Sequence, residues 1–303
     1  MFVSGAGNTN VDLIFSGLPR IPGEGEELYA KGFTLQMGGG VPATLINLGR
    51  LGVPTRIQTM LGKDMFSDFA RSMFSENHVQ PMNLYDGDKI PLNVTAAMLT
   101  PGDRTFVSFS DHIPVTDDMR HMVYQASRGA RVVEMHLGYL DVYRELKKEG
   151  TILVFDTGWE DDLSLEKYMD YIELADYYTP NQKEAMKITG AATPCAAAEV
   201  LADYFDRVIV KLDKDGCLIR ENGKTARIPN IPEYVHRDST GAGDAFLAGL
   251  LYGLYYGYNF KESILFGNIT GGKCITGIGC LAASCTEPEL LETAEKYRSL
   301  LST

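Results

Sequence analysis

Basic residues are scarce in this sequence of 303 residues, in which 28 Lys and Arg oppose 40 Asp and Glu and the formal net charge is −12. An acidic surface repels polyphosphate, so nucleic acid and anionic membranes are not expected partners. A small anion can still bind, because backbone N–H groups at a helix N-terminus hold phosphate without any net positive charge.

Long apolar runs and paired cysteines are also absent. The most membrane-like stretch, residues 245–260, is shorter than the ~20 apolar residues that span a bilayer, so we expect no membrane-spanning helix. The first basic residue is Arg20, which leaves the N-terminus without the charged region of a secretory signal. The five cysteines include no CxxC pair and are expected to be reduced, mostly buried thiols. These absences predict a cytoplasmic protein.

Short apolar runs alternate with longer helical patterns along most of the chain. Strands are predicted at 55–61, 131–137, 151–155 and 207–212, and helices at 65–77, 140–148, 165–175, 241–256, 261–276 and 287–300. This alternation indicates βαβ units and therefore an α/β fold, with a mostly parallel sheet covered by helices on both faces. We find no repeat, low-complexity tract or linker that would divide the chain.

Two segments break this rhythm. Residues 11–36 and 91–111 have the pattern of strands and turns without helices, and the second contains a hairpin through Thr100-Pro101-Gly102-Asp103. Although they are far apart in the sequence, they would pair into a small sheet over one edge of the main domain. Such a sheet is either a lid or a plain excursion of the chain.

The strongest local motif is Asp238-Ser239-Thr240-Gly241-Ala242-Gly243-Asp244, in which a short strand run enters a Gly-Ala-Gly turn and then a helix. The turn lets backbone N–H groups of residues 241–244 converge on one point, where the helix dipole also favours negative charge. Asp244 beside such an anion site suits a general base that accepts a proton from a hydroxyl attacking a phosphate. The alternative is a tight turn followed by an acidic residue that only the helix dipole favours.

Segments of the sequence partly match two nucleotide-binding motifs. Residues 267–273 fit G-x4-G-K, and residues 152–156 look like an apolar strand that ends in a metal-binding Asp. However, position 274 is Cys where a Ser or Thr should bind Mg²⁺, the segment has a helical pattern, and the two motifs come in reverse order. Gly5-Ala6-Gly7 lacks the third glycine of a dinucleotide-binding fingerprint. A P-loop protein and a dehydrogenase are therefore disfavoured.

Three further segments are weaker signals of a binding site. Asn10 and Asp12 share one face of a strand and can bind adjacent hydroxyls of a polyol, although a turn is the commoner role of such residues. The Gly38-Gly39-Gly40 run opens a helix and permits a close approach of the backbone. Asn181 and Glu184 lie one helical turn apart and would either share a hydrated metal ion or form a capping box.

In motif order and spacing, the sequence resembles the ribokinase-like (PfkB) carbohydrate kinases along nearly its whole length. The family's D-[ST]-T-G-A-G-D signature appears at residues 238–244, its N-x-D sugar motif at 10–12, its Gly-Gly run at 38–39 and its N-x-x-E motif at 181–184. The resemblance implies a three-layer ribokinase-like fold, a single kinase domain over residues 1–303, and a lid built from the segments at 11–36 and 91–111. It also implies transfer of the ATP γ-phosphate to a hydroxyl of a small sugar that is fructose-, ribose- or ketodeoxygluconate-like.

The same resemblance assigns roles to particular residues. Asp244 would be the catalytic base, and the amides around the γ-phosphate would be those of Gly241, Ala242 and Gly243. The sugar would be bound by Asn10, Asp12, Gly38 and Gly39. The nucleotide would lie along Lys211, Gly216, Asn268 and Gly279.

Metal ions and a partner subunit are implied as well. Mg²⁺ and its waters would be ordered by Asn181 and Glu184. A monovalent cation, K⁺ in particular, would be bound by Asp238 and the Thr240 carbonyl. The lid would close over the sugar and would join two subunits into a homodimer.

The sequence departs from the family pattern at several positions. Ala43, or Thr44 after a shift of one residue, stands where the family usually has a sugar-binding Asn, which leaves the sugar open. Lys211-Leu212-Asp213 replaces T-L-G at the nucleotide site and adds a charge pair. No Lys follows the Gly-Gly run, which favours a neutral sugar over a sugar phosphate. Arg104 and His136 are either substrate contacts or, respectively, a surface residue of the lid and a hydrogen-bonded buried side chain.

Other functions stay open at this point. A nucleoside kinase of the same fold would need a larger and more aromatic acceptor pocket, and a non-catalytic sugar-binding homologue would account for the missing Asn. The presence of Asp244, Asn181 and Glu184 argues against loss of catalysis. An aldolase would need a Schiff-base Lys that we do not find.

Overall fold

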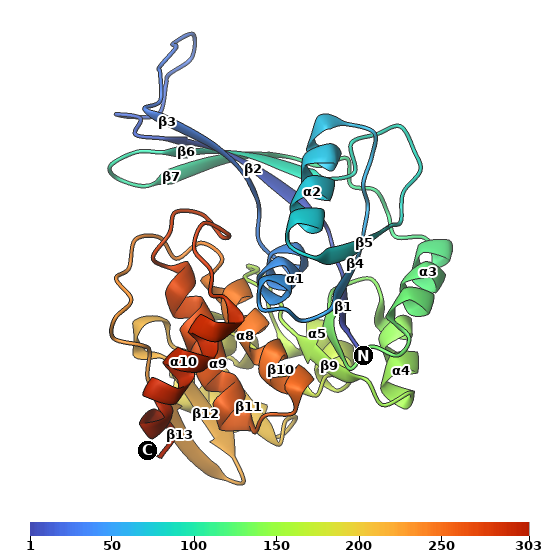
Figure 1. The fold of residues 1–303 in the computed structure, drawn as a ribbon, viewed down its shortest axis with the longest axis vertical. Coiled ribbons are helices and arrows are strands. Elements are labelled where there is room, and N and C mark those ends of the chain that lie inside the picture. Colours follow the sequence, from blue (N-terminus) through green and yellow to red (C-terminus); the bar gives the residue numbers. More distant parts are fainter. Residues whose placement is uncertain (303) are drawn as a thin grey trace.

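The computed structural model describes residues 1–302, and at its centre is a sheet of six parallel strands in the order β10-β9-β8-β1-β4-β5 (Figure 1). The central strands are short, buried apolar runs, as expected where helices cover both faces of a parallel sheet. The six strands are β1 (Val3–Ala6), β4 (Thr55–Thr59), β5 (Val79–Asn83), β8 (Val132–Met135), β9 (Ile152–Phe155) and β10 (Tyr177–Tyr178).

An antiparallel sheet of three strands continues this sheet beyond β10. It consists of β11 (Arg207–Lys211), β12 (Cys217–Glu221) and β13 (Lys224–Ile228). The two sheets are joined by a parallel bridge between Asn181 and Lys211, where the Lys211 N–H donates to the Pro180 carbonyl at 2.9 Å. The bridge brings the end of β11 to the carboxyl edge of the parallel sheet.

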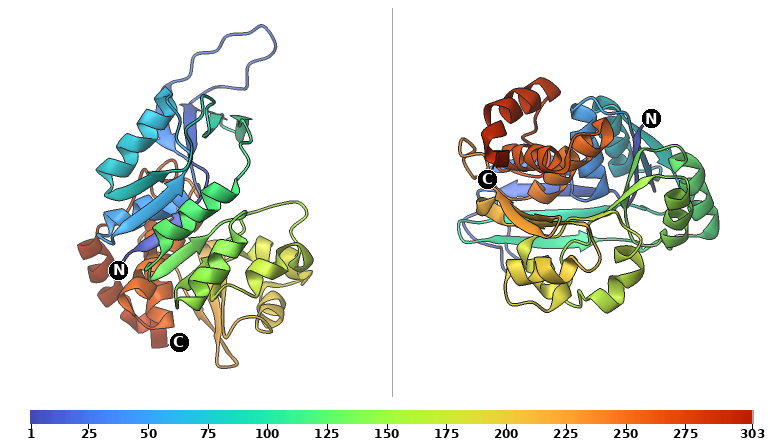
Figure 2. Two further views of the ribbon diagram at one scale, coloured as in Figure 1. Left: turned by 90° about the vertical axis from the view of Figure 1, so that its right-hand side faces the viewer. Right: turned by 90° about the horizontal axis from the view of Figure 1, so that it is seen from below.

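Helices cover both faces of the sheet, so the predicted three-layer α/β arrangement is confirmed (Figure 2). One hydrophobic cluster joins the sheet to the first helical layer, and a second joins it to the opposite layer. The first layer contains α1 (Val41–Arg50), α2 (Met65–Glu76), α8 (Ala242–Tyr256) and α9 (Phe260–Cys274), with α10 (Glu287–Lys296) outside it. The second contains α3 (Asp117–Ser127), α4 (Leu140–Lys148), α5 (Leu165–Ile172), α6 (Gln182–Thr189) and α7 (Pro194–Leu201).

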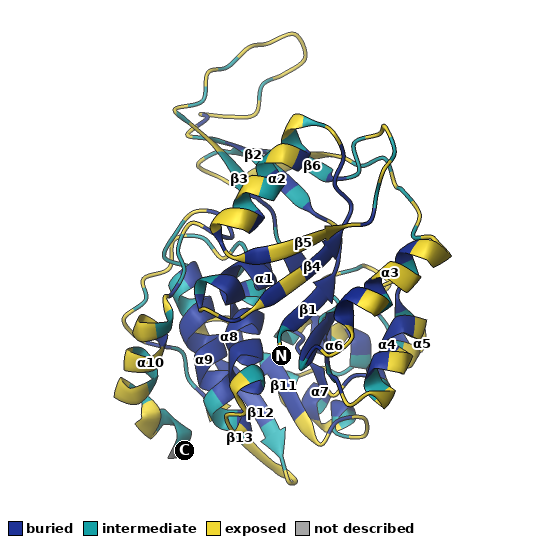
Figure 3. Ribbon diagram, turned by 45° about the vertical axis from the view of Figure 1, so that its right-hand side comes forward, coloured by how far each residue is buried: buried dark blue, intermediate teal, exposed yellow. Residues whose placement is uncertain are grey.

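The helices α8 and α9 are buried along most of their length (Figure 3). Glycines bring the two helices close together: a Cβ on Gly249 would lie 2.4 Å from the Phe266 carbonyl oxygen, and one on Gly253 would lie 2.3 Å from Ser263 Oγ. Residues 267–273 lie inside α9, so they form no phosphate loop. Within residues 1–302, none of the helices is at once long and apolar enough to cross a bilayer.

The predicted elements are present with shifted ends. The helix expected at 140–148 coincides with α4, whereas the one expected at 287–300 ends at Lys296 and is followed by a 3-10 turn, Arg298–Ser302. The prediction missed the hairpin of β12 and β13, and, within the described part of the chain, the short strand that it expected directly before the Gly-Ala-Gly turn is not present. The short 3-10 turn Asp213–Asp215 and Gly216 turn the chain back into β12.

A separate sheet of four strands projects from the body of the molecule (Figure 1). Its strands lie in the order β3-β2-β6-β7, with β2 (Asn10–Ser16), β3 (Gly32–Met37), β6 (Asn93–Leu99) and β7 (Arg104–Phe109). The two segments do pair as predicted, because β2 and β6 are parallel neighbours, and the hairpin turn has the Thr100 N–H bonded to the Asp103 carbonyl at 3.0 Å. The outer strand β7 is exposed along its whole length.

Candidate functional site

The N-termini of α1 and α8 meet near the carboxyl edge of the main sheet. Neither helix has a side-chain cap, so backbone N–H groups of both first turns face the same region. A Cβ on Gly39 would lie 2.7 Å from Asp244 Oδ2, which means that only glycine allows the loop before α1 to touch this carboxylate. The predicted Gly-Gly run and the predicted base are therefore neighbours in space.

The Gly-Ala-Gly turn has the geometry that the motif predicts. Gly241 has a φ of 77°, and a Cβ there would lie 2.2 Å from the Cβ of Cys280, so both the backbone conformation and the available space require glycine. Ala242, Gly243 and Asp244 follow as the first turn of α8. This turn offers its amides to an anion beside the Asp244 carboxyl group.

Asp244 has a strongly perturbed acidity. Burial, the largest cause, and the nearby Asp156 raise the pKa of Asp244 to about 7, against the opposing effects of the Gly40 N–H and Lys211. A carboxyl group that titrates near neutrality is a better proton acceptor than an ordinary aspartate. The environment of Asp244 is thus suited to general-base chemistry.

Asn10 and Asp12 are brought next to the same loop. A Cβ on Gly38 would lie 2.7 Å from Asn10 Cβ and 3.1 Å from both carboxylate oxygens of Asp12. The Asn10 amide donates to the Gly39 carbonyl at 3.1 Å and accepts from Asn93 at 2.8 Å, so this side chain holds the loop against β6. Burial raises the pKa of Asp12, whose carboxylate faces the loop as an acceptor for hydroxyl groups.

A buried lysine lies on the other side of the α8 N-terminus. Lys211 Nζ donates to Asp156 Oδ2 at 2.9 Å, and it lies 3.4 Å from where a Cβ of Gly243 would be. The Lys211 side chain is 14% exposed. Burial alone would lower the pKa of Lys211, but Asp156, Glu184 and Asp244 together raise it, so the ammonium group is charged. It points at the anion-binding turn.

Asp156 is a site residue whose partner the sequence did not reveal. It follows β9 directly, accepts a hydrogen bond from Thr179 Oγ1 at 3.0 Å, and forms the ion pair with Lys211 across 55 positions of sequence. The sequence carried a signal: a carboxylate directly after a buried parallel strand lies at the edge where α/β proteins bind ligands.

Asn181 and Glu184 form the capping box that was one of their two predicted roles. Asn181 Oδ1 accepts from the amides of Lys183 and Glu184, and Glu184 Oε2 accepts from the Asn181 amide at 2.8 Å. Burial and Asp156 raise the pKa of Glu184, with Lys211 opposing them. The capping box therefore fixes the Glu184 carboxylate beside the cluster of Asp156 and Lys211.

Glu134, on β8, is a second carboxyl group that the sequence analysis missed. It is 4% exposed; its Oε1 accepts from Thr44 Oγ1 at 3.3 Å and its Oε2 has no hydrogen-bond partner within the described residues. Burial, followed by Asp244 and Asp156, raises its pKa well above the usual range. Thr44 faces Glu134 and Ala43 is fully buried, so neither replaces the sugar-binding Asn of the family pattern.

The other predicted nucleotide-binding residues differ in where they lie and in what they contact. Asn268 is 3% exposed, and its amide donates to the carbonyls of Ile228 and Pro229, so it orders the backbone instead of reaching into the site. Gly216 approaches the same segment, because its Cβ would lie 2.2 Å from the Ile228 carbonyl oxygen. The Gly279 N–H donates to the Asp238 carboxylate at 2.8 Å. Asp238 lies in the loop that precedes α8, whereas Gly279 lies in the loop that follows α9.

Arg104, at the start of β7, and His136, after the end of β8, differ in their surroundings. Arg104 donates to Thr240 Oγ1 at 2.6 Å and lies 3.4 Å from Asp238 Oδ1, so it contacts both predicted cation ligands and not only solvent. The His136 ring contacts the Leu137 carbonyl, and burial lowers the pKa of His136, in agreement with a hydrogen-bonded buried side chain.

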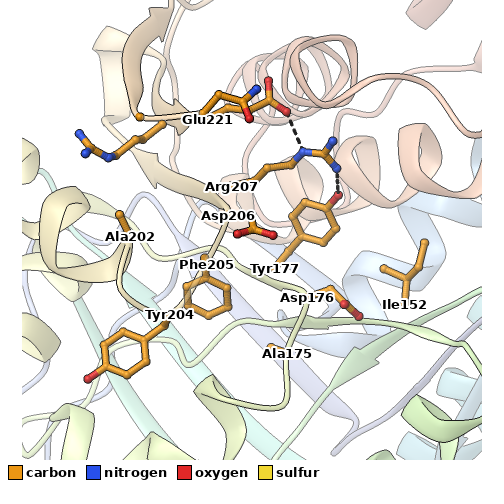
Figure 4. A pocket seen from close by; sticks show the side chains of 13 residues that line it. Ile152, Ala175, Asp176, Tyr177, Ala202, Tyr204, Phe205, Asp206, Arg207 and Glu221 are labelled. Carbon is orange, nitrogen blue, oxygen red and sulfur yellow. Dashed lines mark hydrogen bonds and ion pairs between the residues drawn. The ribbon is translucent and has the colours of Figure 1, made fainter.

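A cavity of about 880 Å³ lies at the opposite edge of the sheet and contains none of the predicted site residues (Figure 4). Arg207 lies between two of its lining residues, donating to Glu221 at 2.7 Å and to the Tyr177 hydroxyl at 3.0 Å. Asp176 is paired with Lys147. Four of the charged groups at this edge are therefore paired with one another.

Comparison with known proteins agrees with this site. The chain matches the model of the pfkB family carbohydrate kinases over residues 5–287. It is 24% identical over 320 residues to the ribokinase of Lactococcus lactis, covering 98% of this chain and 97% of that one. It is 26% identical over 265 residues to the ATP-dependent 6-phosphofructokinase of Thermoanaerobacterium thermosaccharolyticum, covering 80% of each. The structure of Arabidopsis thaliana ribokinase complexed with ribose and ATP matches with a TM-score of 0.81 and 20% identity over 97% of this chain and 98% of that one.

The three-layer fold and the anion-binding turn define a phosphotransferase of the ribokinase-like class. The chain belongs to the pfkB family of carbohydrate kinases. The predicted fold, family and sugar kinase activity are thereby confirmed.

Proposed function

We propose that this kinase transfers the γ-phosphate of ATP to a hydroxyl of a small neutral sugar held against Asn10, Asp12, Gly38 and Gly39. The observation that carries the proposal is the position of Asp244, which touches Gly39 on the sugar side and belongs to the uncapped first turn of α8 on the phosphate side. A hydroxyl bound at the first place attacks a phosphate bound at the second.

The chemistry balances without a covalent enzyme intermediate. The hydroxyl oxygen forms a bond to the γ-phosphorus, the bond from that phosphorus to the β,γ-bridging oxygen breaks, and the hydroxyl proton moves to Asp244. Even a carboxylate with a pKa of about 7 cannot ionise an alcohol in advance, so it accepts the proton late, as the new bond forms. The products are a sugar phosphate and ADP.

Charge on the transferring phosphate is neutralised by the backbone and by Lys211. The amides of Gly241 and Gly243 would donate to the phosphate, whereas the Ala242 N–H already donates to the Ser239 carbonyl at 3.2 Å. Lys211 Nζ is held by Asp156 next to Gly243. Donors fixed in this way stabilise developing charge without reorganisation. Gly216 and Gly279 would lie along the nucleotide, and Asn268 would act on it only through the backbone at 228–229.

A divalent cation fits the acidic side of this site. Asp156, Glu184 and Asp244 outnumber Lys211, which leaves an excess of negative charge near carboxylate oxygens of the kind that Mg²⁺ prefers. Asn181 and Glu184 would hold Mg²⁺ through its waters. When bound, the ion would neutralise charge on the phosphate oxygens.

The four-stranded sheet would be the lid of a single kinase domain over residues 1–303, and its outer edge would join two subunits. Phe106, Val107 and Phe109 on β7 are 48–63% exposed, an apolar surface on an edge strand that pairing with a second copy would cover. The five free cysteines support a reducing, cytoplasmic location.

A coupled ADP-release assay tests the proposal. MgATP is offered with ribose, fructose, other ketoses and aldoses, 2-keto-3-deoxygluconate, fructose phosphates and nucleosides. We expect turnover with a neutral sugar, abolished in Asp244→Asn while nucleotide binding, measured by calorimetry, stays within about 3-fold, because the substitution removes a proton acceptor used only in the transition state.

Asp141→Asn is the matched control, because Asp141 is exposed on α4 and pairs with Arg144 at the surface of the second layer. Near-normal turnover in Asp244→Asn would contradict the assignment of the base. Preference for a nucleoside or a sugar phosphate would contradict the neutral sugar.

A further inference from the structure

An arginine from the four-stranded sheet reaches the loop that precedes the anion-binding turn. Arg104, at the start of β7, donates through Nη1 to Thr240 Oγ1 at 2.6 Å and lies 3.4 Å from Asp238 Oδ1. Its guanidinium carbon is 5.7 Å from the ring centroid of Phe106, which restricts the side chain. Asp238 and Thr240 are the residues to which the family resemblance assigns a monovalent cation.

The carboxylate of Asp238 is already fully engaged. Its Oδ1 accepts from the amide and the hydroxyl of Thr240 at 3.0 and 2.8 Å, and its Oδ2 accepts from the Gly279 N–H at 2.8 Å. The guanidinium group is its cationic neighbour.

The carbonyl oxygens beside Asp238 face a thiol. Cys274 Sγ lies 3.5 Å from the Thr240 carbonyl oxygen and 3.6 Å from that of Cys280. The Cys274 thiol thus lies within donor distance of both oxygens. A hard alkali cation needs such oxygens as ligands and gains little from sulfur. These residues therefore do not fit a bound monovalent cation.

We propose that Arg104 supplies, from the four-stranded sheet, the positive charge at Asp238 and Thr240, so that phosphate transfer requires no K⁺ and the turn at Gly241 is complete only while the sheet is docked. The proposal rests on the proposed kinase function. Arg104 is a positioning residue: it fixes the loop from which α8 starts and compensates the Asp238 charge close to the phosphate site.

A second contact supports docking of the sheet on this loop. Gln36, on β3, donates to the Ile278 carbonyl at 3.1 Å, and Gly279 passes so close that a Cβ there would meet the Gln36 amide. Strands from both edges of the four-stranded sheet, β3 and β7, thus contact the two loops that flank the start of α8.

Steady-state kinetics test the proposal, with the sugar that the ADP-release assay identifies as the substrate. The assay uses MgATP at constant ionic strength with KCl, NaCl or tetramethylammonium chloride. We expect the wild-type kcat to agree within about 2-fold in all three salts. In tetramethylammonium chloride, Arg104→Ala is expected to lower kcat at least 10-fold with a smaller change in KM, because a misplaced anion site fails mainly in the transition state.

Two variants separate charge from folding. Arg104→Lys keeps the charge and is expected to retain more kcat than Arg104→Ala. Arg20→Ala is the matched control, because Arg20 lies in the β2–β3 connection and pairs only with the exposed Glu26. Partial recovery of Arg104→Ala by millimolar guanidinium chloride would support a role of the charge itself.

A melting curve gives a readout that does not depend on catalysis. Replacing tetramethylammonium chloride by KCl is expected to leave the wild-type Tm unchanged to within about 1 °C. A K⁺-specific rise in the Tm, a 10-fold activation by K⁺, or a wild-type kcat in Arg104→Ala without K⁺ would each overturn the inference. Absence of turnover with every sugar would instead contradict the proposed function, and the melting experiment would still decide the cation question.

Discussion

The charged side chains at the two edges of the main sheet are arranged differently: ion pairs are found at the amino edge, whereas carboxylates are in excess at the carboxyl edge. At the amino edge, around the cavity of Figure 4, Arg207 pairs with Glu221 and Lys147 pairs with Asp176, so these four charges compensate one another. At the carboxyl edge, Lys211 is surrounded by Asp156, Glu184 and Asp244, and buried Glu134 lies nearby. Although the amino edge has the large open cavity, it is the carboxyl edge whose charges are unbalanced.

This difference indicates where chemistry takes place. Keeping charged groups of one sign together out of water costs free energy, and the cost is lowered when a ligand of opposite charge distribution binds. The charged side chains of a site that binds MgATP are therefore not fully paired before the ligand binds. At the amino edge the ion pairs of Arg207 and of Asp176 are already formed, so a ligand there would gain less from compensating them.

The largest expected effect comes from removing Lys211, the cation in the carboxylate cluster at the carboxyl edge. Lys211→Met should lower kcat/KM by about 10²–10³, because it removes a preorganised donor to the phosphate. It should also lower the free energy of unfolding by about 3 kcal/mol, because Asp156 loses its buried partner. Arg207→Met makes the same change at the amino edge and should leave kcat/KM within about 2-fold, since surface ion pairs contribute little. Equal losses of activity in the two variants would erase the contrast between the edges.

The pH dependence of kcat/KM should reflect the same excess of carboxylates at the carboxyl edge. Since the pKa of Asp244 is raised to about 7 and the base must be ionised, kcat/KM should fall about 10-fold per pH unit below pH 7 and level off above it. Partners at this edge set the midpoint, because Lys211 lowers this pKa and Asp156 raises it. A profile that is flat between pH 5.5 and 8 would show that Asp244 is an ordinary aspartate.

The smallest expected effect concerns the stability contribution of Glu134. Because its pKa in the folded state is raised above the unfolded value, the folded protein binds a proton more tightly, and the free energy of unfolding falls as the pH rises from about 4 toward the folded-state pKa. Glu134→Gln keeps an acceptor for Thr44 and removes this titration. Urea unfolding at pH 5 to 8 should show the variant more stable than the wild type by about 1–2 kcal/mol at pH 8 and no more stable at pH 5. A constant difference would mean that Glu134 is ionised in the folded protein.

Local signals in the sequence predicted much of this site. The turn at residues 241–243 requires glycine and leads directly into a helix, so the motif specifies its own geometry. Asn10 and Asp12 follow from strand alternation in the same way. The three-layer fold likewise follows from strands and helices that alternate along the chain.

Contacts between distant segments were not predictable in this way. The pairing of Lys211 with Asp156 depends on which strands are neighbours, and the contact of Arg104 with Asp238 depends on how the four-stranded sheet is oriented. Asn268 illustrates the same difficulty. The family pattern placed this residue along the nucleotide, whereas the packing of α9 against the end of β13 directs its side-chain amide to backbone carbonyls.

The bridge between Asn181 and Lys211 links catalytic competence to local unfolding. Lys211 carries the ammonium group that we propose binds the phosphate, while its own amide closes the seam between the parallel sheet and the antiparallel hairpin. Opening of that seam would withdraw the phosphate-binding cation even though the six parallel strands stay folded. The hydrogen exchange rate of the Lys211 amide should therefore report the fraction of molecules that are temporarily inactive, and a ligand that bridges Lys211 and Asp244 should slow that exchange more than exchange in the centre of the parallel sheet.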